Sequence, residues 1–290
     1  MPYTDSADVR LYYEVFAEAD AAADAPVLVL VSGGGAQLLS WDEEFIGILT
    51  AGGLRVVRFD NRDTGLSQLF GGADDVDGGY DLIDLAEDVL RVLDDLGVAQ
   101  AHVAGHSMGG MMAQMLAIHH PERILSLGLL STIPGQSRRW VAHGERPELA
   151  ETPVRVTREQ AVAFTRAAFD AAPVGRFDHQ VEWHVRATGE AYDRGYYPEG
   201  FSRQWAALTR APERLEALRA VTAPTFVFHG RDDDVLHWAS AVDIAEAIPG
   251  AELQVHPDMG HLIPHELWPE LAAGLLRTAA RAEGRAEGRG

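Results

Sequence analysis

The stretch "HVAGHSMGGMMAQ", residues 102–114, places a single serine among glycines where strand-like sequence gives way to helix-like sequence. Its first residues are typical of the end of a buried strand, and the run from Met108 to Ile118 is typical of a helix. Gly105 and Gly109 stand two residues on either side of Ser107. A sharp strand-to-helix turn projects a serine hydroxyl above a sheet, and it needs glycines where side chains would clash. The stretch therefore predicts either a nucleophile or a structural glycine turn.

Short apolar runs of the same kind recur along the chain. They lie at residues 26–31, 54–59, 102–105, 124–130, 225–230 and 252–256. Segments with helical character separate them, at residues 41–53, 81–97, 108–120 and 239–250. Short continuous apolar runs fit strands that are buried on both faces of a parallel sheet. The alternation predicts an α/β fold, a parallel sheet with helices on both faces, and the segment 9–19 is expected to add edge strands.

The alternation stops between about Pro134 and Arg219, a segment that is rich in helical patterns and holds Trp140, Trp183 and Trp205. We interpret this segment as a helical insertion between two strands. The expected organisation is a core domain formed by residues 1–133 and 220–280 and a helical cap at 134–219, followed by a tail at 281–290, where a polar tetrapeptide repeats. This tail is expected to be either a frayed helix end or disordered.

Composition excludes several classes of function. The 290 residues include no cysteine, and all 24 basic residues are arginine, so thiol, Schiff-base and P-loop lysine chemistry are excluded. The net charge of −20 argues against nucleic acid and anionic membranes as partners. No apolar run reaches the roughly 18 residues of a membrane span, and the first residues lack the pattern of a signal peptide. We therefore expect a cytoplasmic protein.

A serine nucleophile requires an acid and then a histidine later in the chain. The run "FVFHGRDDDVLHW", residues 226–238, supplies aspartates just after a predicted strand. The G-x-x-D spacing favours Asp233 as the acid, with Asp232 or Asp234 as alternatives. A solvated acidic turn is the competing interpretation, and it is preferred for the two neighbours.

The histidine is expected in "VHPDMGHLIPHE", residues 255–266, where His261 follows a glycine in a loop. His265 lies four residues further on, a spacing that could indicate a metal pair. Pro264 disfavours the continuous helix that such a pair needs, and no third ligand is clustered nearby, so no metal site is predicted.

Acyl transfer also requires backbone N–H donors for the negative charge that develops on the carbonyl oxygen. One donor is expected from Met108, the residue after the nucleophile. The other is expected from Gly34 in the "SGGGA" loop, with Gly33 and Gly35 allowing close approach of the backbone. A phosphate-binding loop is the competing interpretation, but the G-x-G-x-x-G spacing is absent.

Together these motifs resemble the α/β-hydrolase superfamily over residues 9–280. The resemblance rests on "LVSGGGAQLLSW", "FDNRDTGLS", "GHSMGG", "APTFVFHGRDD" and "PDMGHLIP", which follow in the order of the family. It implies an eight-stranded, mostly parallel sheet with a helical cap, and it implies Ser107 as nucleophile, Asp233 as acid and His261 as base. "FDNRDTGLS" with "GYYPEGFSRQW" is most similar to bacterial esterases of the aclacinomycin methylesterase and LipG-like type.

Two positions depart from the family pattern. Ser32-Gly33 replaces the His-Gly of many relatives, which keeps the backbone donor but changes its support. Asp63 stands within the loop at 62–67, where it either touches the substrate or fixes the loop through Arg62.

These observations predict a serine esterase that forms an acyl-enzyme without a cofactor and acts on a small-molecule ester, either a methyl ester or a hydrophobic or aromatic ester. Gly35, Trp41, Trp183, Tyr197 and Trp205 are expected to bind substrate. The alternatives are a cofactor-free perhydrolase, a lactonase or a C–C hydrolase with the same triad, or a ligand-binding protein without turnover.

Overall fold

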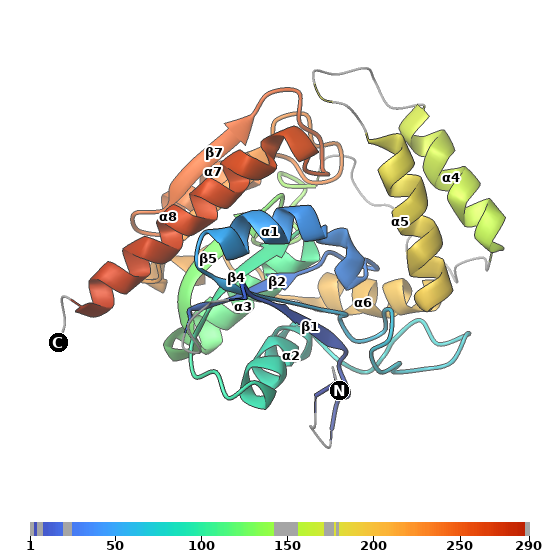
Figure 1. Ribbon diagram of the computed structural model, residues 1–290, viewed down its shortest axis with the longest axis horizontal. Helices are drawn as coiled ribbons and strands as arrows, with labels where there is room; N and C mark the ends of the chain where they lie inside the picture. The colour runs from blue at the N-terminus through green and yellow to red at the C-terminus, as the bar shows by residue number, and fades with distance from the viewer. Residues whose placement is uncertain are drawn as a thin grey trace.

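The computed structural model describes residues 3–4, 8–19, 25–141, 156–170, 177 and 180–287. These residues form one sheet in the strand order β1-β3-β2-β4-β5-β6-β7 (Figure 1). Its strands are β1 (Tyr13–Phe16), β2 (Val27–Val31), β3 (Arg55–Phe59), β4 (Ala101–His106), β5 (Ile124–Leu130), β6 (Thr225–Gly230) and β7 (Glu252–His256). Only β1 runs antiparallel to its neighbour, so the predicted mostly parallel sheet is confirmed.

The expected count of eight strands is wrong for the described residues, which form seven. Ahead of β1 the described residues make only an isolated antiparallel bridge, between Tyr3 and Tyr12. The Thr4 N–H donates to the carbonyl of Leu11 at 2.9 Å beside this bridge. A single bridge pairs too few residues to form a strand, so β1 is the edge strand of the sheet.

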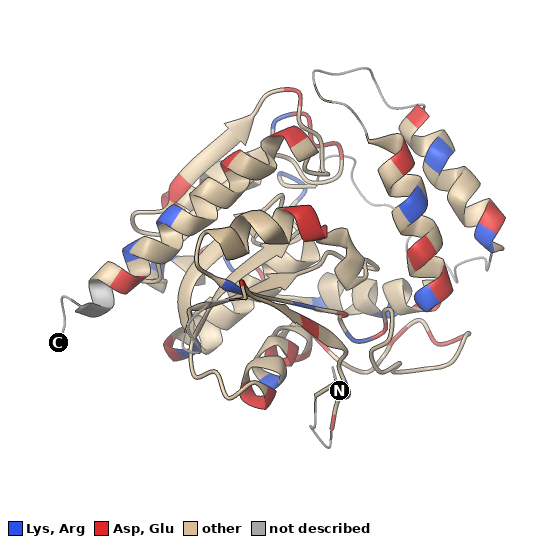
Figure 2. Ribbon diagram, in the orientation of Figure 1, with Lys and Arg blue, Asp and Glu red and all other residues tan. Residues whose placement is uncertain are grey.

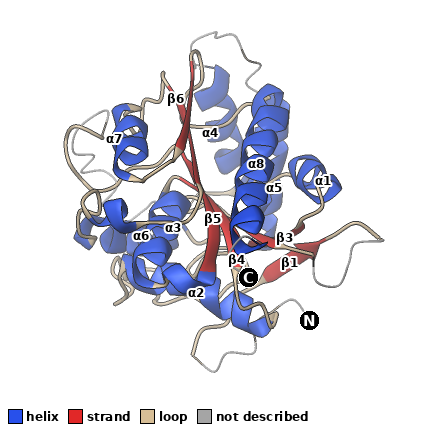
Figure 3. Cartoon of the chain, turned by 90° about the vertical axis from the view of Figure 1, so that its left-hand side faces the viewer, coloured by secondary structure: helices blue, strands red, loops and turns tan. Residues whose placement is uncertain are grey.

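Helices cover both faces of the sheet, as the alternation of elements predicts. They are α1 (Glu43–Ala51), α2 (Leu82–Asp95), α3 (Met108–His119), α7 (Ala239–Ala247) and α8 (Trp268–Glu287). Strand β2 shows how the faces divide: Val27, Val29 and Val31 pack with α2, α3 and α7, whereas Leu28 and Leu30 pack with α1 and α8. Alternate side chains of a strand point to opposite faces, which gives one apolar layer on each face, and Figure 3 shows helices on both sides of the sheet.

The parallel direction of the strands determines where polar residues can gather. β2, β4, β6 and β7 are parallel, so their carboxyl ends lie at one edge of the sheet. The loops that follow these strands carry the glycine run 33–35, Ser107, Asp233 and His261 respectively. Ligand sites of open α/β sheets lie at this edge.

Between β5 and β6 the described residues form three further α-helices: α4 (Arg158–Asp170), α5 (Val181–Arg194) and α6 (Pro198–Arg210). We call them the helical insertion. Figure 2 shows charged residues of both signs along α4 and α5. Two exposed ion pairs link these helices, Arg158 with Asp193 and Arg166 with Glu182.

Of the two alternatives for the tail from residue 281, the described residues form a helix end, because α8 continues to Glu287. Ala279 and Ala282 are buried along this helix, and Ala, Arg and Glu favour helix formation. Residues 288–290 of the predicted tail lie outside the described residues. None of the helices in the described part of the chain combines the length and apolarity needed to cross a membrane.

Candidate active site

Ser107 occupies a strained turn between β4 and α3. Its φ of 55° and ψ of −117° lie outside the regions that most L-residues adopt. The surrounding backbone holds it there: the Ser107 N–H donates to the Leu130 carbonyl at 2.9 Å, and the Thr132 hydroxyl donates to the Ser107 carbonyl at 2.8 Å. Strain of this kind persists only where the surroundings fix it, and it is common at active sites.

The glycines around Ser107 are required by close backbone contacts. A Cβ atom at Gly105 would lie 2.1 Å from the carbonyl oxygen of Gly109. A Cβ at Gly109 would lie 2.2 Å from the carbonyl oxygen of Val31 in the neighbouring strand. The sequence prediction that side chains would clash at these two positions is therefore confirmed.

Ser107, His261 and Asp233 form a continuous chain of hydrogen bonds. The Ser107 Oγ lies 3.1 Å from His261 Nε2, and His261 Nδ1 lies 2.8 Å from Asp233 Oδ2. Asp233 is 5% exposed, whereas its neighbours Asp232 and Asp234 are exposed. Three residues that are more than 25 positions apart in sequence are thus brought together at one edge of the sheet.

Four donors surround the Asp233 carboxylate. The backbone N–H groups of Val235 and Leu236 each donate to Oδ1 at 2.8 Å. The other oxygen, Oδ2, faces His261 Nδ1 at 2.8 Å and His229 Nε2 at 3.1 Å. Burial alone would raise the pKa of Asp233, but the hydrogen bonds from His229 and His261 outweigh it and lower the pKa well below its usual range. The carboxylate is therefore ionised and fixed in orientation.

His229 is a further partner of Asp233 that the sequence motifs do not single out. Its Nε2 also lies 3.0 Å from the Leu236 carbonyl oxygen. Because both neighbours of Nε2 are acceptors, that nitrogen carries the proton and donates to them. The one available signal was a histidine inside the buried apolar run 225–230, four residues before the acid.

His106, a second histidine that the sequence motifs do not single out, lies against the candidate base. Its Nε2 donates to the His261 carbonyl at 2.9 Å, and the two rings are 4.9 Å apart. Burial, with a smaller effect from His261, lowers the pKa of His106 to about 4. His106 is therefore neutral near pH 7 and supports the loop that carries His261.

The two predicted N–H donors lie near Ser107. A Cβ at Gly33 would be 3.3 Å from the Ser107 Cβ, and one at Gly34 would be 3.8 Å from the Met108 Sδ. Gly35 donates its N–H to the Gln204 side chain at 2.8 Å. Within the described part of the chain, the Gly34 and Met108 N–H groups make no hydrogen bond to protein. They are thus available to a bound carbonyl oxygen.

Comparison with known proteins identifies the family of the chain. The family model for the alpha/beta hydrolase fold matches residues 26–266. The chain belongs to the α/β-hydrolase family. It is 30% identical over 257 residues to the "putative carbamate hydrolase RutD" of Variovorax paradoxus, covering 87% of this chain and 89% of that protein. Rhodomycin D methylesterase DnrP of Streptomyces peucetius is 30% identical over 279 residues, covering 87% and 90%.

A solved structure extends the comparison to three dimensions. The crystal structure of a hydrolase from Pseudomonas aeruginosa is 28% identical, has a TM-score of 0.75, and is similar over 95% of this chain and 97% of its own. The α/β-hydrolase fold that the sequence motifs imply is therefore confirmed.

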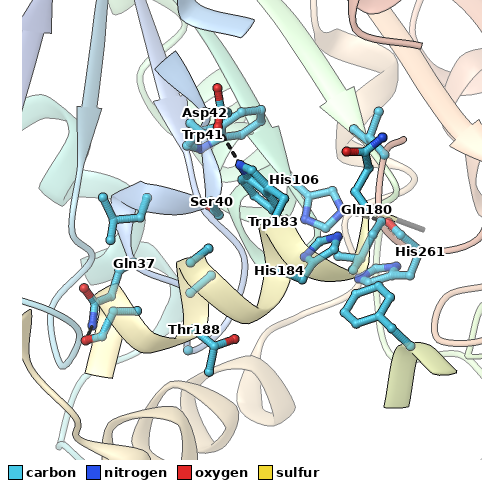
Figure 4. A pocket seen from close by; sticks show the side chains of 18 of the residues that line it. Gln37, Ser40, Trp41, Asp42, His106, Gln180, Trp183, His184, Thr188 and His261 are labelled. Carbon is cyan, nitrogen blue, oxygen red and sulfur yellow. Dashed lines mark hydrogen bonds between the residues drawn. The ribbon is translucent and has the colours of Figure 1, made fainter. Parts of the chain in front are cut away.

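In this α/β-hydrolase a pocket of about 980 Å³ lies between the edge of the sheet and the helical insertion. Figure 4 shows His106 and His261 together in its wall, with Trp183 and His184 of α5 facing them and Gln37 further away. Its aromatic lining consists of Trp41, Phe45, Phe169, Phe177, Trp183, Tyr192, Tyr196, Tyr197, Phe201 and Trp268. The Trp183 Nε1 donates to Asp42 at 2.6 Å and fixes one wall.

Four of the five predicted substrate-binding residues, Gly35, Trp41, Trp183 and Tyr197, line this pocket. Trp205, the fifth, is not part of the pocket lining, and its side chain packs against the hydrophobic core on the α2–α3 face of the sheet. Most of the other aromatic residues of the insertion line the pocket.

Asp63 is fully buried and does not reach the pocket. Its carboxylate accepts from the Arg203 guanidinium and the Tyr80 hydroxyl, each at 2.7 Å. Arg62 instead pairs with Asp88, so the expected route of loop fixation through Arg62 is wrong. Asp63 fixes the loop by pairing with α6 of the insertion.

The two histidines considered as a metal pair have different surroundings. His261 faces Ser107 and Asp233, whereas the His265 ring lies 3.7 Å from the Trp268 ring and 5.4 Å from that of Trp183. Among the described residues, no group of three or more His, Asp or Glu side chains is arranged to hold a metal ion.

Proposed function

We propose that this α/β-hydrolase is a carboxylic ester hydrolase in which Ser107 is the nucleophile, His261 the base and Asp233 the acid. The observation that carries the proposal is the hydrogen-bond chain from Ser107 through His261 to Asp233, placed beside an aromatic pocket. A serine hydroxyl becomes nucleophilic when a positioned base takes its proton, and this chain provides such a base.

The chemistry follows from the positions of the donors and acceptors. His261 Nε2 accepts the Ser107 proton as the oxygen attacks the ester carbonyl, and Asp233 holds the Nδ1–H tautomer. The Gly34 and Met108 N–H groups donate to the developing oxyanion. His261 then protonates the leaving alcohol and activates a water molecule that hydrolyses the acyl-enzyme.

The pocket and the relatives indicate the class of ester. Aromatic side chains form much of the pocket wall and favour a substrate with a hydrophobic or aromatic group. One relative is named as a methylesterase of rhodomycin D, which supports a methyl ester of a ring compound as the substrate. We place this activity in the cytoplasm and assign it no cofactor.

Carbamate hydrolysis is a second candidate, because the relative in Variovorax paradoxus is named for carbamate. Both reactions begin with attack on a carbonyl carbon. The volume of the pocket, about 980 Å³, favours a substrate with a bulky group. Parallel assays with methyl esters that carry an aromatic group and with carbamates that carry the same aromatic group would rank the two candidates.

The decisive experiment combines covalent labelling with turnover. A fluorophosphonate probe should label the wild-type protein at Ser107, and Ser107→Ala should abolish both labelling and hydrolysis of nitrophenyl esters without unfolding the protein. A folded wild-type protein that neither reacts with the probe nor hydrolyses any ester would overturn the proposal.

The assignment of the acid can be tested separately. Asp233→Asn should lower kcat about 10⁴-fold, because the amide would stabilise the wrong tautomer of His261. Asp232→Asn changes the exposed neighbour in the same turn and should stay within about threefold of wild type. Comparable activity in the two variants would refute the role of Asp233.

A further inference from the structure

The glycine loop after β2 is a tight turn that a helix of the insertion contacts directly. The Ala36 N–H donates to the Gly33 carbonyl at 3.2 Å, and Gly35 has a φ of +69°. A turn closed in this way with a positive φ at its third residue is typical of type II, which favours glycine there. The Gly33 carbonyl and the Gly34 N–H belong to the same peptide group, so this turn orients the proposed oxyanion donor.

Two residues of α6, Phe201 and Gln204, lie three positions apart and face the turn. A Cβ at Gly34 would lie 2.9 Å from the Phe201 ring, so the ring packs on the glycine backbone. The Gln204 Oε1 accepts the Gly35 N–H at 2.8 Å, and its Nε2 donates to the Arg62 carbonyl at 2.8 Å. Gln204 has no exposed surface. Both ends of its amide are therefore engaged, which fixes its orientation.

The hydrogen bond from Gly35 holds the central peptide group of the turn. Type I and type II turns differ by a flip of this peptide group, and two adjacent glycines offer little steric resistance to such a flip. The flip would change the backbone dihedral angles of Gly34 and Gly35 and disturb the alignment of the Gly34 N–H. The same bond occupies the Gly35 N–H, which leaves Gly34 as the free donor of the turn.

We infer that Gln204 is a positioning residue that holds the turn at 33–36 in the conformation in which the Gly34 N–H can stabilise the oxyanion. This inference rests on the proposed function. Gln204 does not touch the reacting atoms, and it acts through the Gly35 peptide group.

The test uses Gln204→Leu, which removes both amide contacts. The second-order rate of fluorophosphonate labelling should fall about tenfold, because attack on phosphorus also places charge in the oxyanion hole. The kcat for nitrophenyl esters should fall by a similar factor while KM stays within about twofold, since the interaction forms in the transition state. A loss confined to KM would overturn the inference.

Gln136→Leu is the matched control, because the Gln136 Nε2 donates to the Leu208 carbonyl on the same helix but away from the turn. It should label at the wild-type rate. An equal loss in both variants would show that general attachment of α6 is responsible and would overturn the inference.

Gln204→Glu keeps the test decisive if the leucine variant does not fold. Its carboxylate can still accept from Gly35, and only its protonated form can donate to the Arg62 carbonyl. The ratio of its labelling rate to that of wild type should rise as the pH falls, and a ratio that stays constant with pH would overturn the inference.

A folded wild-type protein that is not labelled would refute the proposed function itself. Wild type that is labelled, together with a folded Gln204→Leu variant that is equally reactive, would refute only the role of Gln204.

Discussion

The sheet and the helical insertion are held by different kinds of interaction. Strands such as β2 bury apolar side chains on both faces. In contrast, α4 has no buried side chain, and α6 buries charged and polar groups such as Arg203 and Gln204. The insertion is tied to the loop after β3 by two ion pairs, Arg203 with Asp63 and Arg194 with Asp60. Apolar burial tolerates many sequences, whereas a buried polar contact depends on the particular partner.

The largest expected effect comes from breaking the most buried of these polar contacts. Arg203→Met would leave the Asp63 carboxylate buried without its cation and should lower the free energy of unfolding by about 3–5 kcal/mol. Arg166→Met removes an exposed ion pair with Glu182 on the outer helices and should leave stability unchanged within error. Urea unfolding of both variants measures the contrast. Equal losses would show that the insertion is not held by its buried pair.

The stability of the core should fall in acid, because the core contains buried neutral histidines. Burial lowers the pKa of His102 on β4 to about 4, from an ordinary value of 6.5. Between these values the unfolded chain binds more protons than the folded one, so the free energy of unfolding falls as the pH falls from 6.5 towards 4. Between pH 7 and pH 5 the share of His102 is on the order of 2 kcal/mol.

His102→Gln should remove that share, so the variant should lose less stability than wild type over the same range. Urea unfolding at pH 7 and pH 5 measures the difference. If both proteins lost the same free energy of unfolding, His102 would not be the source of the acid sensitivity.

The smallest expected effect distinguishes the two sides of the insertion. Trp183→Phe keeps an aromatic wall but removes the hydrogen bond to Asp42, so KM should rise a few-fold with kcat within about twofold. Trp205→Phe should leave KM unchanged and lower the melting temperature, because Trp205 packs on the core. Steady-state kinetics with an aromatic ester and thermal unfolding measure the two outcomes. A rise in KM for Trp205→Phe alone would reverse the assignment of the two tryptophans.

Much of the sheet and the candidate site can be predicted because local patterns determine them. Strands β2 to β6 coincide with short apolar runs, since a strand buried on both faces requires such a run, whereas the edge strand β7 is partly exposed. The order of Ser107, Asp233 and His261 follows from the placement of loops at the carboxyl ends of parallel strands. The glycines around Ser107 follow from steric clashes.

The attachment of the insertion could not be predicted in the same way. The partner of Asp63 is 140 positions away and that of Asp60 is 134 positions away, and no periodicity in the sequence indicates either pair. Trp205 and Phe201 lie one helical turn apart, yet one faces the core and the other the pocket. The orientation of α6 against the sheet determines which of the two side chains faces the core and which faces the pocket.

The distances along the chain also determine the order in which the contacts of the active site can form during synthesis on the ribosome. Gly35 must wait for Gln204, 169 residues later, and Ser107 must wait for His261, 154 residues later. Contacts this remote close slowly, because the entropy of the intervening loop is lost first. A chain released before residue 261 therefore carries the strained turn with Ser107 but lacks the base that would activate this serine.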